Sequence, residues 1–172
     1  KLLFSMDGKR LFGAQIVGTD GVDKRIDVLA AAIRLGASVS DLTKLELAYA
    51  PPYSSAKDPV NMAGYVAENL LTGKVAFSSW DALDKRDGAV VLDVRETMER
   101  QAFELPDSVH IPLGQLRERI GELDPARRYI ILCAVGVRAY NASRILSAHG
   151  FKNVLVYPGG THFYRSTHFP LF

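Results

Sequence analysis

Apolar residues change their spacing along this chain, and the change occurs near residues 71–76. Before it, two short apolar runs at 2–5 and 11–18 flank Met6-Asp7-Gly8-Lys9, a turn sequence typical of a β-hairpin. Apolar positions with helical spacing follow in three segments, 22–35, 38–47 and 59–71. A hairpin followed by helices predicts an α+β unit over residues 1–72.

The only cysteine, Cys133, lies between a predicted strand and a predicted helix. Residues 128–132 form a short, apolar run typical of a buried strand, and residues 138–149 have helical spacing and end at Gly150. Cys133 therefore lies beside free backbone N–H groups and the positive end of a helix dipole. Together with the Arg138 guanidinium, this environment favours a thiolate. The alternative is a buried, inert cysteine.

The length of the loop between Cys133 and Arg138 limits what it can hold. Phosphatases with the same kind of loop have one more residue, and their loop surrounds a tetrahedral phosphoryl group. The shorter ring suits a smaller terminal atom, such as the outer sulfur of a cysteine persulfide. The residues that would form this substrate loop are Ala134, Val135, Gly136 and Val137.

Residues 79–165 resemble a rhodanese domain, and the loop length is that of a sulfurtransferase. Residues 89–95 resemble the first core strand of that family with its Asp-x-Arg signature, and 108–113 resemble the second strand with its Ile-Pro exit. Residues 153–160 resemble the last strand and its Gly-Gly turn. The resemblance implies an α/β rhodanese domain with a central, mostly parallel sheet over residues 77–172.

Asp93 and Arg95, from the Asp-x-Arg signature, are expected to support the site. Asp93 ends a predicted strand and can cap the helix expected at 96–103, while Arg95 can pair with a carboxylate and hold the loop. A direct catalytic part for either residue is the alternative. Because ligands of open α/β sheets bind at the carboxyl ends of the strands, we expect Asp93, Cys133 and Gly159 to be neighbours.

The first unit resembles the dimerisation domain of the flavin-dependent pyridine nucleotide-disulfide oxidoreductases. The match is carried by Gly-Ala-Gln-Ile-Val-Gly at 13–18 and Tyr-Ala-Pro-Pro-Tyr at 49–53, and residues 57–64 point to the coenzyme A-disulfide reductase branch. The resemblance implies a homodimer through residues 1–72. It also implies that Tyr49, or secondarily Tyr53, reaches the reductase site of the partner subunit; the alternative is that both rings pack beside the Pro-Pro turn.

A dimerisation domain followed by a rhodanese domain resembles the tail of a fused coenzyme A-disulfide or persulfide reductase. The sequence contains no Gly-x-Gly-x-x-Gly, the phosphate-binding turn of FAD and NAD(P)H sites, and it begins with Lys1 rather than Met. It is therefore interpreted as a C-terminal fragment without a cofactor of its own. FAD, NAD(P)H and coenzyme A are expected for the parent protein, in which flavin domains would precede these residues.

Composition limits the classes of partner that the protein is expected to bind. A net charge of +2 is too small to indicate nucleic acid or membrane binding, and no apolar run approaches the roughly 20 residues of a membrane helix. One cysteine excludes an internal disulfide and suits a reducing cytoplasm. His162 and His168 are six residues apart, but they are interpreted as surface or packing residues rather than metal ligands.

Three classes of function fit these observations. The first is a rhodanese-type sulfurtransferase, in which Cys133 takes sulfane sulfur from a small donor and passes it to a thiol acceptor. The second is a dimerisation or scaffold module with a non-catalytic rhodanese fold, against which the intact Cys133 argues. The third is a phosphatase or arsenate reductase; the short loop and the lack of a second cysteine argue against it.

Overall fold

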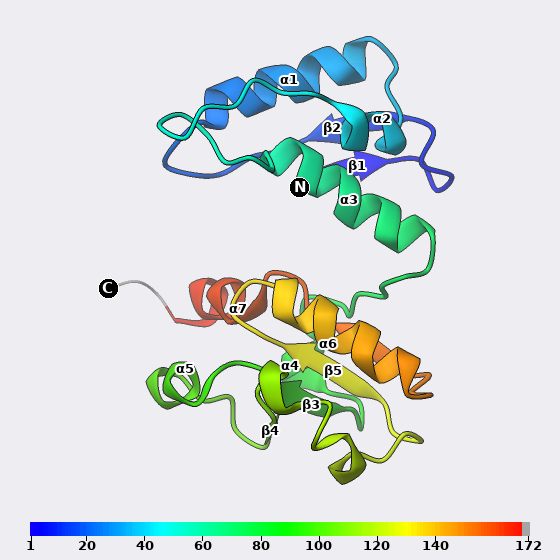
Figure 1. Ribbon diagram of the computed structural model, residues 1–172, viewed down its shortest axis with the longest axis vertical. Coiled ribbons are helices and arrows are strands. Elements are labelled where there is room, and N and C mark those ends of the chain that lie inside the picture. The colour runs from blue at the N-terminus through cyan, green and yellow to red at the C-terminus, as the bar shows by residue number, and fades with distance from the viewer. Residues whose placement is uncertain (170–172) are drawn as a thin grey trace. The chain divides into compact units, whose positions relative to one another are not determined.

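The computed structural model describes residues 1–169, and the chain forms two compact units, Lys1–Lys74 and a second unit that begins at Val75. Figure 1 labels the helices and strands of both units. In the first unit they are β1 (Leu2–Phe4), β2 (Leu11–Ala14), α1 (Val22–Arg34), α2 (Val39–Lys44) and α3 (Pro59–Leu71). In the second they are α4 (Ala82–Lys85), β3 (Val90–Asp93), α5 (Thr97–Ala102), β4 (Val109–His110), the 3-10 turns η1 (Leu113–Gln115) and η2 (Ile120–Glu122), β5 (Tyr129–Leu132), α6 (Val137–Ala148), β6 (Val154–Val156) and α7 (Gly160–His168).

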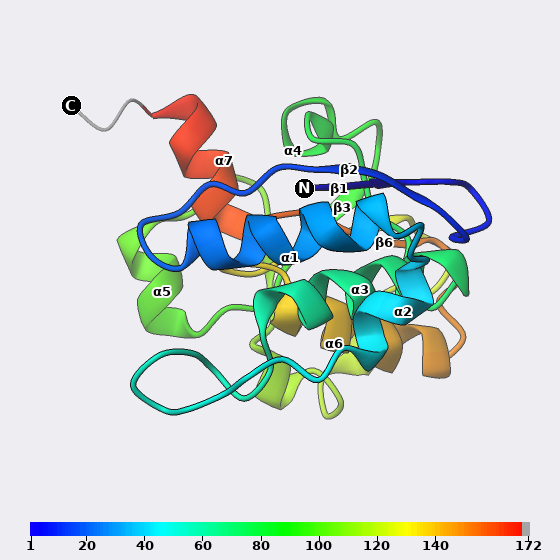
Figure 2. The same ribbon diagram turned by 90° about the horizontal axis from the view of Figure 1, so that it is seen from above.

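The first unit is a hairpin covered by helices, as its sequence predicts. Strands β1 and β2 pair antiparallel with Leu2 opposite Ala14, and the Ser5 N–H donates to the Arg10 carbonyl across the turn at 2.9 Å. Figure 2 shows α1 beside this hairpin and α2 beside α3. The apolar faces of these elements meet in one core, made of Leu11, Leu29, Ala32, Val39, Leu42, Val60 and Ala67.

Two buried polar side chains fix the start of α3. Asp58 is the N-cap: its carboxylate accepts the Val60 N–H at 2.9 Å and also binds Arg25 of α1. Asn61 donates both of its amide hydrogen bonds, each 2.9 Å long, to the carbonyls of Leu42 and Leu45 at the end of α2. The last carbonyls of α2 are thereby paired inside the protein.

The second unit is built on a four-stranded sheet with strand order β4-β3-β5-β6, in which every pair is parallel. Along β3 and β5, Val90 lies opposite Tyr129 and Asp93 opposite Leu132. A further parallel bridge joins Phe77 to Val156. The predicted fold class, an α+β dimerisation domain followed by an α/β rhodanese domain with a central, mostly parallel sheet, is confirmed.

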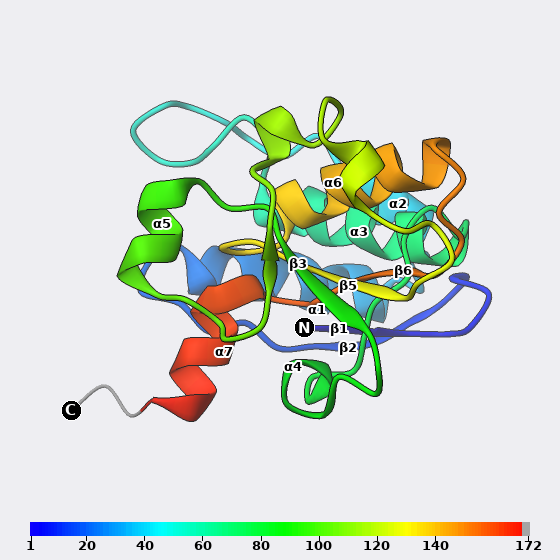
Figure 3. The same ribbon diagram turned by 90° about the horizontal axis from the view of Figure 1, so that it is seen from below.

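Side chains of the central strand β5 alternate between two cores, one on each face of the sheet. Tyr129, Ile131 and Cys133 face the core that α6 covers, and Ile130 and Leu132 face the core that contains residues of α4 and α7 (Figure 1, Figure 3). Because both faces are covered, β5 is apolar throughout. Cys133 comes directly after this buried strand, and its side chain continues the alternation on the α6 side of the sheet.

Candidate functional site

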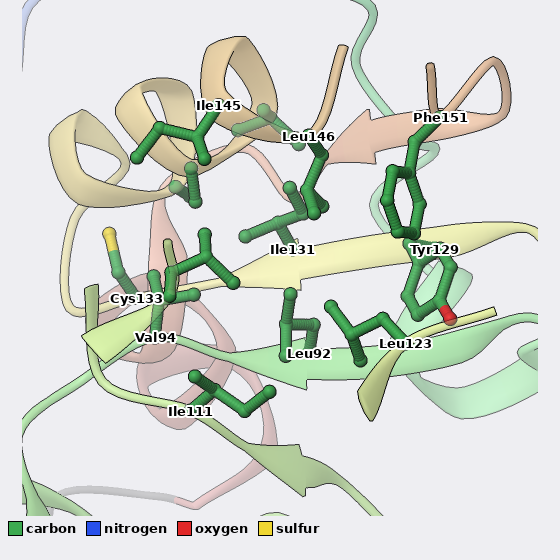
Figure 4. Close-up of a cluster of buried hydrophobic side chains, with 14 of the residues drawn as sticks. Leu92, Val94, Ile111, Leu123, Tyr129, Ile131, Cys133, Ile145, Leu146 and Phe151 are labelled. Carbon is green, nitrogen blue, oxygen red and sulfur yellow. The ribbon is translucent and has the colours of Figure 1, made fainter. Parts of the chain in front are cut away.

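Cys133 lies at the carboxyl end of β5, at the start of the loop that leads into α6. Figure 4 shows its side chain among Ile131, Val94 and the other apolar residues on the α6 side of the sheet. The residue is 1% exposed, and the Gly136 N–H donates a hydrogen bond to its sulfur at 3.0 Å. The chain turns back over the sulfur at Gly136, whose φ of 131° is accessible to glycine alone among ordinary residues. The loop therefore closes around Sγ.

The start of α7 holds the outer side of this loop. The Thr161 N–H donates to the Cys133 carbonyl at 2.8 Å, and the His162 N–H donates to the Ala134 carbonyl at 3.1 Å. A Cβ on Gly160 would overlap these two carbonyl groups, so α7 can approach the loop this closely only with glycine there.

These contacts also orient the amides of the loop. All peptides of residues 1–169 are trans, so the N–H of each peptide points opposite to its carbonyl. With the carbonyls of Cys133 and Ala134 turned toward α7, the N–H groups of Ala134 and Val135 point away from it. Neither N–H finds an acceptor among residues 1–169. The loop thus presents hydrogen-bond donors to whatever lies beside the sulfur.

Arg138 does not extend a free guanidinium toward the sulfur. It forms two hydrogen bonds with the Glu99 carboxylate of α5, 2.5 and 2.6 Å long. These bonds lower the pKa of Glu99 from 4.5 to about 2 and raise the pKa of Arg138, to which the charge on Cys133 makes a smaller contribution. The two terminal nitrogens of Arg138 are thus paired with a carboxylate 39 residues earlier, a partner that the sequence analysis did not predict.

The Asp-x-Arg signature forms a buried ion pair. Asp93 is fully buried and Arg95 is 3% exposed, and the guanidinium donates to both carboxylate oxygens, at 2.6 Å for the shortest bond. Arg95 also donates to the carbonyl of Glu99, within α5, and to the carbonyl of Phe103, directly after α5. The pair therefore fastens α5, and with it Glu99, to the end of β3.

The expected capping role of Asp93 is wrong. The N-cap of α5 is Glu96, three residues later, whose backbone N–H donates to the Glu99 carboxylate at 3.0 Å. Asp93 belongs to β3 itself and uses its oxygens for the side chain and the backbone N–H of Arg95. The expected pairing of Arg95 with a neighbouring carboxylate is confirmed.

The structure brings together the strand ends that the sequence marked. The Val94 N–H, directly after Asp93, donates to the Leu132 carbonyl, and the turn at Gly159 leads straight into the α7 amides that bind the Cys133 loop. Tyr49 and Tyr53 belong to the first unit, between α2 and α3, where they are 52% and 83% exposed.

Sequence reasoning missed three residues of the site. Glu99 binds Arg138, and Thr161 and His162 bind the loop through backbone groups. Contacts made by backbone groups cannot be predicted from the types of the side chains. An acidic residue one turn into the helix after Asp-x-Arg was the only signal for Glu99, and nothing in the sequence connected it to position 138.

The residues that the structure describes contain no group of three or more His, Cys, Asp or Glu side chains arranged to hold a metal ion. None of the helices found between residues 1 and 169 is long and apolar enough to cross a membrane. His162 lies at the start of α7, and His168, at its end, binds Asp84 of α4 at 3.1 Å.

Comparison with known families gives each unit a separate match. The model of the rhodanese-like domain matches residues 79–166, which is half of the chain, so the chain belongs to the rhodanese family. The model of the pyridine nucleotide-disulphide oxidoreductase dimerisation domain matches residues 1–59. The domain order expected from the sequence is confirmed.

Two solved structures match almost the whole chain, and a curated reductase matches a shorter stretch of it. Coenzyme A disulfide reductase of Staphylococcus epidermidis is 50% identical over 68 residues, 40% of this chain and 16% of that protein. The crystal structure of reduced Bacillus anthracis CoADR-RHD is 44% identical with a TM-score of 0.91, covering 96% of this chain and 30% of that one. A NAD-dependent persulfide reductase from A. fulgidus is 41% identical with a TM-score of 0.82, covering 95% of this chain and 29% of that one. The resemblance to the C-terminal part of a coenzyme A-disulfide reductase and rhodanese fusion is confirmed.

A rhodanese-related structure matches just over half of this chain. The rhodanese-related protein of Thermoplasma volcanium is 29% identical with a TM-score of 0.51, and the match covers 56% of this chain and 95% of that protein. The matched residues thus cover nearly all of that structure, but a sixth of the curated reductase and under a third of each of the two reductase structures.

Proposed function

We propose that the second unit is a sulfurtransferase domain that carries sulfane sulfur as a persulfide on Cys133. The observation that carries the proposal is the loop itself, which surrounds the only thiol with N–H donors. Gly136 donates to Sγ, and the amides of Ala134 and Val135 are turned away from α7 without a protein acceptor among residues 1–169. Such donors stabilise negative charge on sulfur.

The reaction has two balanced steps. The Cys133 thiolate attacks the outer sulfur of a donor R–S–SH; a new S–S bond forms, the donor S–S bond breaks, and R–S⁻ leaves with the bonding electrons. An acceptor thiolate R′–S⁻ then attacks the outer sulfur of Cys133–S–SH, which gives R′–S–SH and regenerates the Cys133 thiolate. No external oxidant or reductant is needed, because sulfane sulfur moves between thiols.

The geometry favours this chemistry over phosphoryl or arsenate transfer. Cys133 is 1% exposed, and its loop is one residue shorter than the loop of a phosphatase, which favours a single terminal sulfur over a tetrahedral oxyanion. Persulfide chemistry is also the activity that gives the A. fulgidus relative its name, and that relative is 41% identical to this chain. Ala134, Val135, Gly136 and Val137 would form the substrate loop through their backbone.

Arg138, Asp93 and Arg95 take positioning roles in this proposal. Arg138 begins α6 and is held by Glu99, while the Asp93–Arg95 pair holds the helix that carries Glu99. The end of β3, α5 and the start of α6 are thereby linked by charge-assisted hydrogen bonds. This linkage fixes the exit of the loop, as α7 fixes its outer side.

The test is replacement of the nucleophile. Because the chain has a single cysteine, a sulfur atom added to the intact protein by a persulfide donor and removable by cyanide must be on Cys133. Cys133→Ser should gain no sulfur and lose sulfur transfer, while its unfolding transition stays near that of the native chain because serine can still accept the Gly136 N–H. The matched control is Ser147→Ala, an exposed position of α6, which should behave like the native protein. If the native chain gains no sulfur, or Cys133→Ser transfers it equally well, the domain is a non-catalytic module.

We also propose that this chain works with a flavin reductase centre. The relatives named as coenzyme A disulfide reductases and as a persulfide reductase supply this expectation. Without Gly-x-Gly-x-x-Gly, these residues do not build the phosphate-binding turn for FAD or NAD(P)H, so those cofactors would bind elsewhere in a longer protein. In that setting coenzyme A would be the mobile thiol that accepts sulfur from Cys133.

Residues 1–72 would serve as the dimerisation domain and residues 77–172 as the rhodanese-like domain. A homodimer through the first unit is supported by the family match and by the outer face of α3, where Met62, Val66 and Leu70 are 39%, 46% and 42% exposed. These side chains line a groove with Leu2 and Ile16. Sedimentation at micromolar concentration tests the dimer, and Val66→Glu should weaken it.

Tyr49 is proposed as the residue that reaches the reductase site of a partner subunit, with Tyr53 as the second choice. Both rings are available for this, since they are 52% and 83% exposed between α2 and α3. A phenol can donate a hydrogen bond to an attacking or leaving sulfur. In the full-length parent, Tyr49→Phe should lower reductase turnover more than Tyr53→Phe does.

A further inference from the structure

A groove lies on the outer side of α6, apart from the Cys133 loop. Its volume is about 410 Å³, which is within the range of small-molecule sites. The lining comes from two segments of the second unit. One contains Leu113 of η1 and Arg117, and the other is α6 with its C-cap, from Asn141 to His149. We call this hollow the α6 groove.

The α6 groove is long enough for an elongated ligand. A helix rises 1.5 Å per residue, so Asn141 and His149 lie about 12 Å apart along the axis of α6. A single inorganic ion would fill only a fraction of this length. The dimensions therefore match a molecule of about the size of a nucleotide.

The middle of the α6 groove is apolar. Between Asn141 and His149, α6 contributes Ile145 and Ala148 to the lining, and Leu113 adds a third apolar side chain. Ile145, which Figure 4 shows on α6, belongs to the hydrophobic core and is 8% exposed, and Leu113 packs against the same core. A ligand body that lies on these side chains would bury apolar surface.

Arg117 is the cation that the α6 groove offers to a ligand. Its side chain is exposed and has no hydrogen-bond or ion-pair partner among residues 1–169. Arg119, two residues later, is paired with Glu122, and Arg144, which also lines the groove, has another interaction within the chain. Arg117 therefore keeps the donor face of its guanidinium for an anion.

The charge around the α6 groove is positive. No Asp or Glu of the described part of the chain lines it. Residues 113–152, the stretch that contains every lining residue, include seven Arg or Lys but three Asp or Glu. His149 adds a ring whose Nδ1 donates to the Ile145 carbonyl at 2.8 Å, which leaves Nε2 for a ligand. An anionic ligand is therefore favoured over a neutral or cationic one.

From these features we propose that the α6 groove binds an organic phosphate, a molecule with a flat or apolar body and a phosphate group at one end. The phosphate pairs with Arg117, and the body lies on Leu113, Ile145 and Ala148. A phosphate fits better than a carboxylate because it carries nearly two negative charges at neutral pH and three acceptor oxygens, two of which one guanidinium can bind. The site is separate from the Cys133 loop and does not depend on the proposed sulfur transfer.

Calorimetric titration of the native chain with AMP tests this proposal, at about pH 7.5, where the phosphate is largely a dianion. Two control ligands divide the molecule: adenosine lacks the phosphate, and inorganic phosphate lacks the body. AMP should bind with a dissociation constant below about 1 mM, and each control ligand at least about tenfold more weakly. Added salt should weaken the binding of AMP.

Two matched pairs of variants locate the site. Arg117→Gln should weaken AMP binding at least about tenfold, whereas Arg128→Gln removes the same charge from an exposed position outside the groove and should change it less than about twofold. Ala148→Glu places a carboxylate in the groove and should also weaken binding about tenfold or more. Its control is Ser147→Glu, at the neighbouring exposed position of α6 outside the lining, which should bind AMP like the native chain.

Each result decides the proposal. If AMP does not bind, or adenosine binds as tightly as AMP, the groove is not an organic-phosphate site. If Arg117→Gln and Arg128→Gln bind AMP equally well, the phosphate is held elsewhere and the assignment is wrong. If a tetraglutamate peptide binds as tightly as AMP, the groove recognises an acidic protein segment instead.

The supporting result is a loss of AMP binding in Arg117→Gln and Ala148→Glu, with native binding in their two controls. Cys133→Ser should bind AMP like the native chain, so a failure of sulfur transfer and a failure of phosphate binding are observed separately.

Discussion

Replacing Glu99 by glutamine should weaken both the second unit and its sulfur transfer, because it breaks the ion pair that fixes the start of α6. The glutamine amide could keep one hydrogen bond to Arg138, but it lacks the charge and the second strong acceptor of the carboxylate. The loop between Cys133 and Arg138 would then be held on its α7 side alone.

The size of the effect follows from the pKa of Glu99 and its exposure. Lowering that pKa from 4.5 to about 2 would correspond to roughly 3 kcal/mol in a fully buried pair. The side chains of Arg138 and Glu99 are 29% and 36% exposed, so water screens the pair, and we expect a loss of about 1 kcal/mol. That loss lowers the unfolding midpoint of a domain of this size by about 4–8 °C. If the same free energy is needed to hold the loop in its reactive shape, transfer slows about fivefold.

The lowered pKa of Glu99 also predicts how the effect of the substitution on stability depends on pH. Because the pKa of Glu99 is lowered on folding, its contribution to stability is fully present above pH 4.5 and is lost as the pH falls toward about 2. Native protein and Glu99→Gln should therefore differ in unfolding free energy at neutral pH and converge in acid. Urea titrations at several pH values measure this difference directly.

A matched control comes from Glu122→Gln. Glu122 binds Arg119 with two hydrogen bonds of 2.7 and 2.8 Å, in a pair that is more exposed and belongs to η2 rather than to the loop. This substitution should change the unfolding free energy little, because the pair is exposed to solvent, and it should leave sulfur transfer unchanged. If Glu99→Gln behaves like Glu122→Gln, with native transfer rates, the Glu99–Arg138 pair does not position the loop.

Three further predictions concern the stability of the two units. Gly160→Ala should destabilise the second unit by at least about 1–2 kcal/mol and impair sulfur transfer, because the φ of Gly160 is 61° and a Cβ would overlap the loop carbonyls. In the control Gly114→Ala the added Cβ meets open space, so the unfolding free energy should change by less than about 0.5 kcal/mol. Asn61→Ala should cost about 1–3 kcal/mol in thermal or urea unfolding, because two buried carbonyls lose their donor; an unchanged midpoint would refute this account of α3. The pKa of His168 is raised above 6.5, first by a backbone carbonyl one turn earlier and then by Asp84, so its contribution to stability is complete below pH 6.5 and is lost as the pH rises through the raised value. Proton NMR titration should show this, and an equal His168 pKa in Asp84→Asn would exclude the Asp84 contribution.

The pattern of apolar residues by itself predicted the hairpin and the three helices of the first unit, and β5 and α6 of the second, but it did not predict α4 or α7. Helix α3 begins at Pro59 and ends at Leu71, the limits that the spacing predicts, because a proline at the first helical position and an N-cap aspartate are local signals. The buried strand β5 was predictable because a short, uniformly apolar run is typical of a strand that is covered on both faces. The helix after Cys133 was predictable from its apolar spacing and from Gly150 at its end.

Local signals failed where a residue had more than one possible partner. Asp93 looked like a helix cap from its place after a strand, but Arg95 lies two residues away with a charge that a backbone N–H lacks, and the buried carboxylate binds it. The N-cap of α5 is Glu96 instead. Sequence spacing alone does not rank these competing acceptors.

For the chemistry, the sequence determined which atom can react: there is one cysteine, at a strand-to-helix turn, in a loop of fixed length. What surrounds that atom was decided by tertiary structure. The pairing of Arg138 with Glu99 and the capture of the loop carbonyls by α7 join residues 39 and about 28 positions apart, and they exist only because parallel strands bring their carboxyl ends to one edge. Which carboxylate pairs with Arg138 could not be predicted from the sequence, because the fold brings Glu99 to it from a different element.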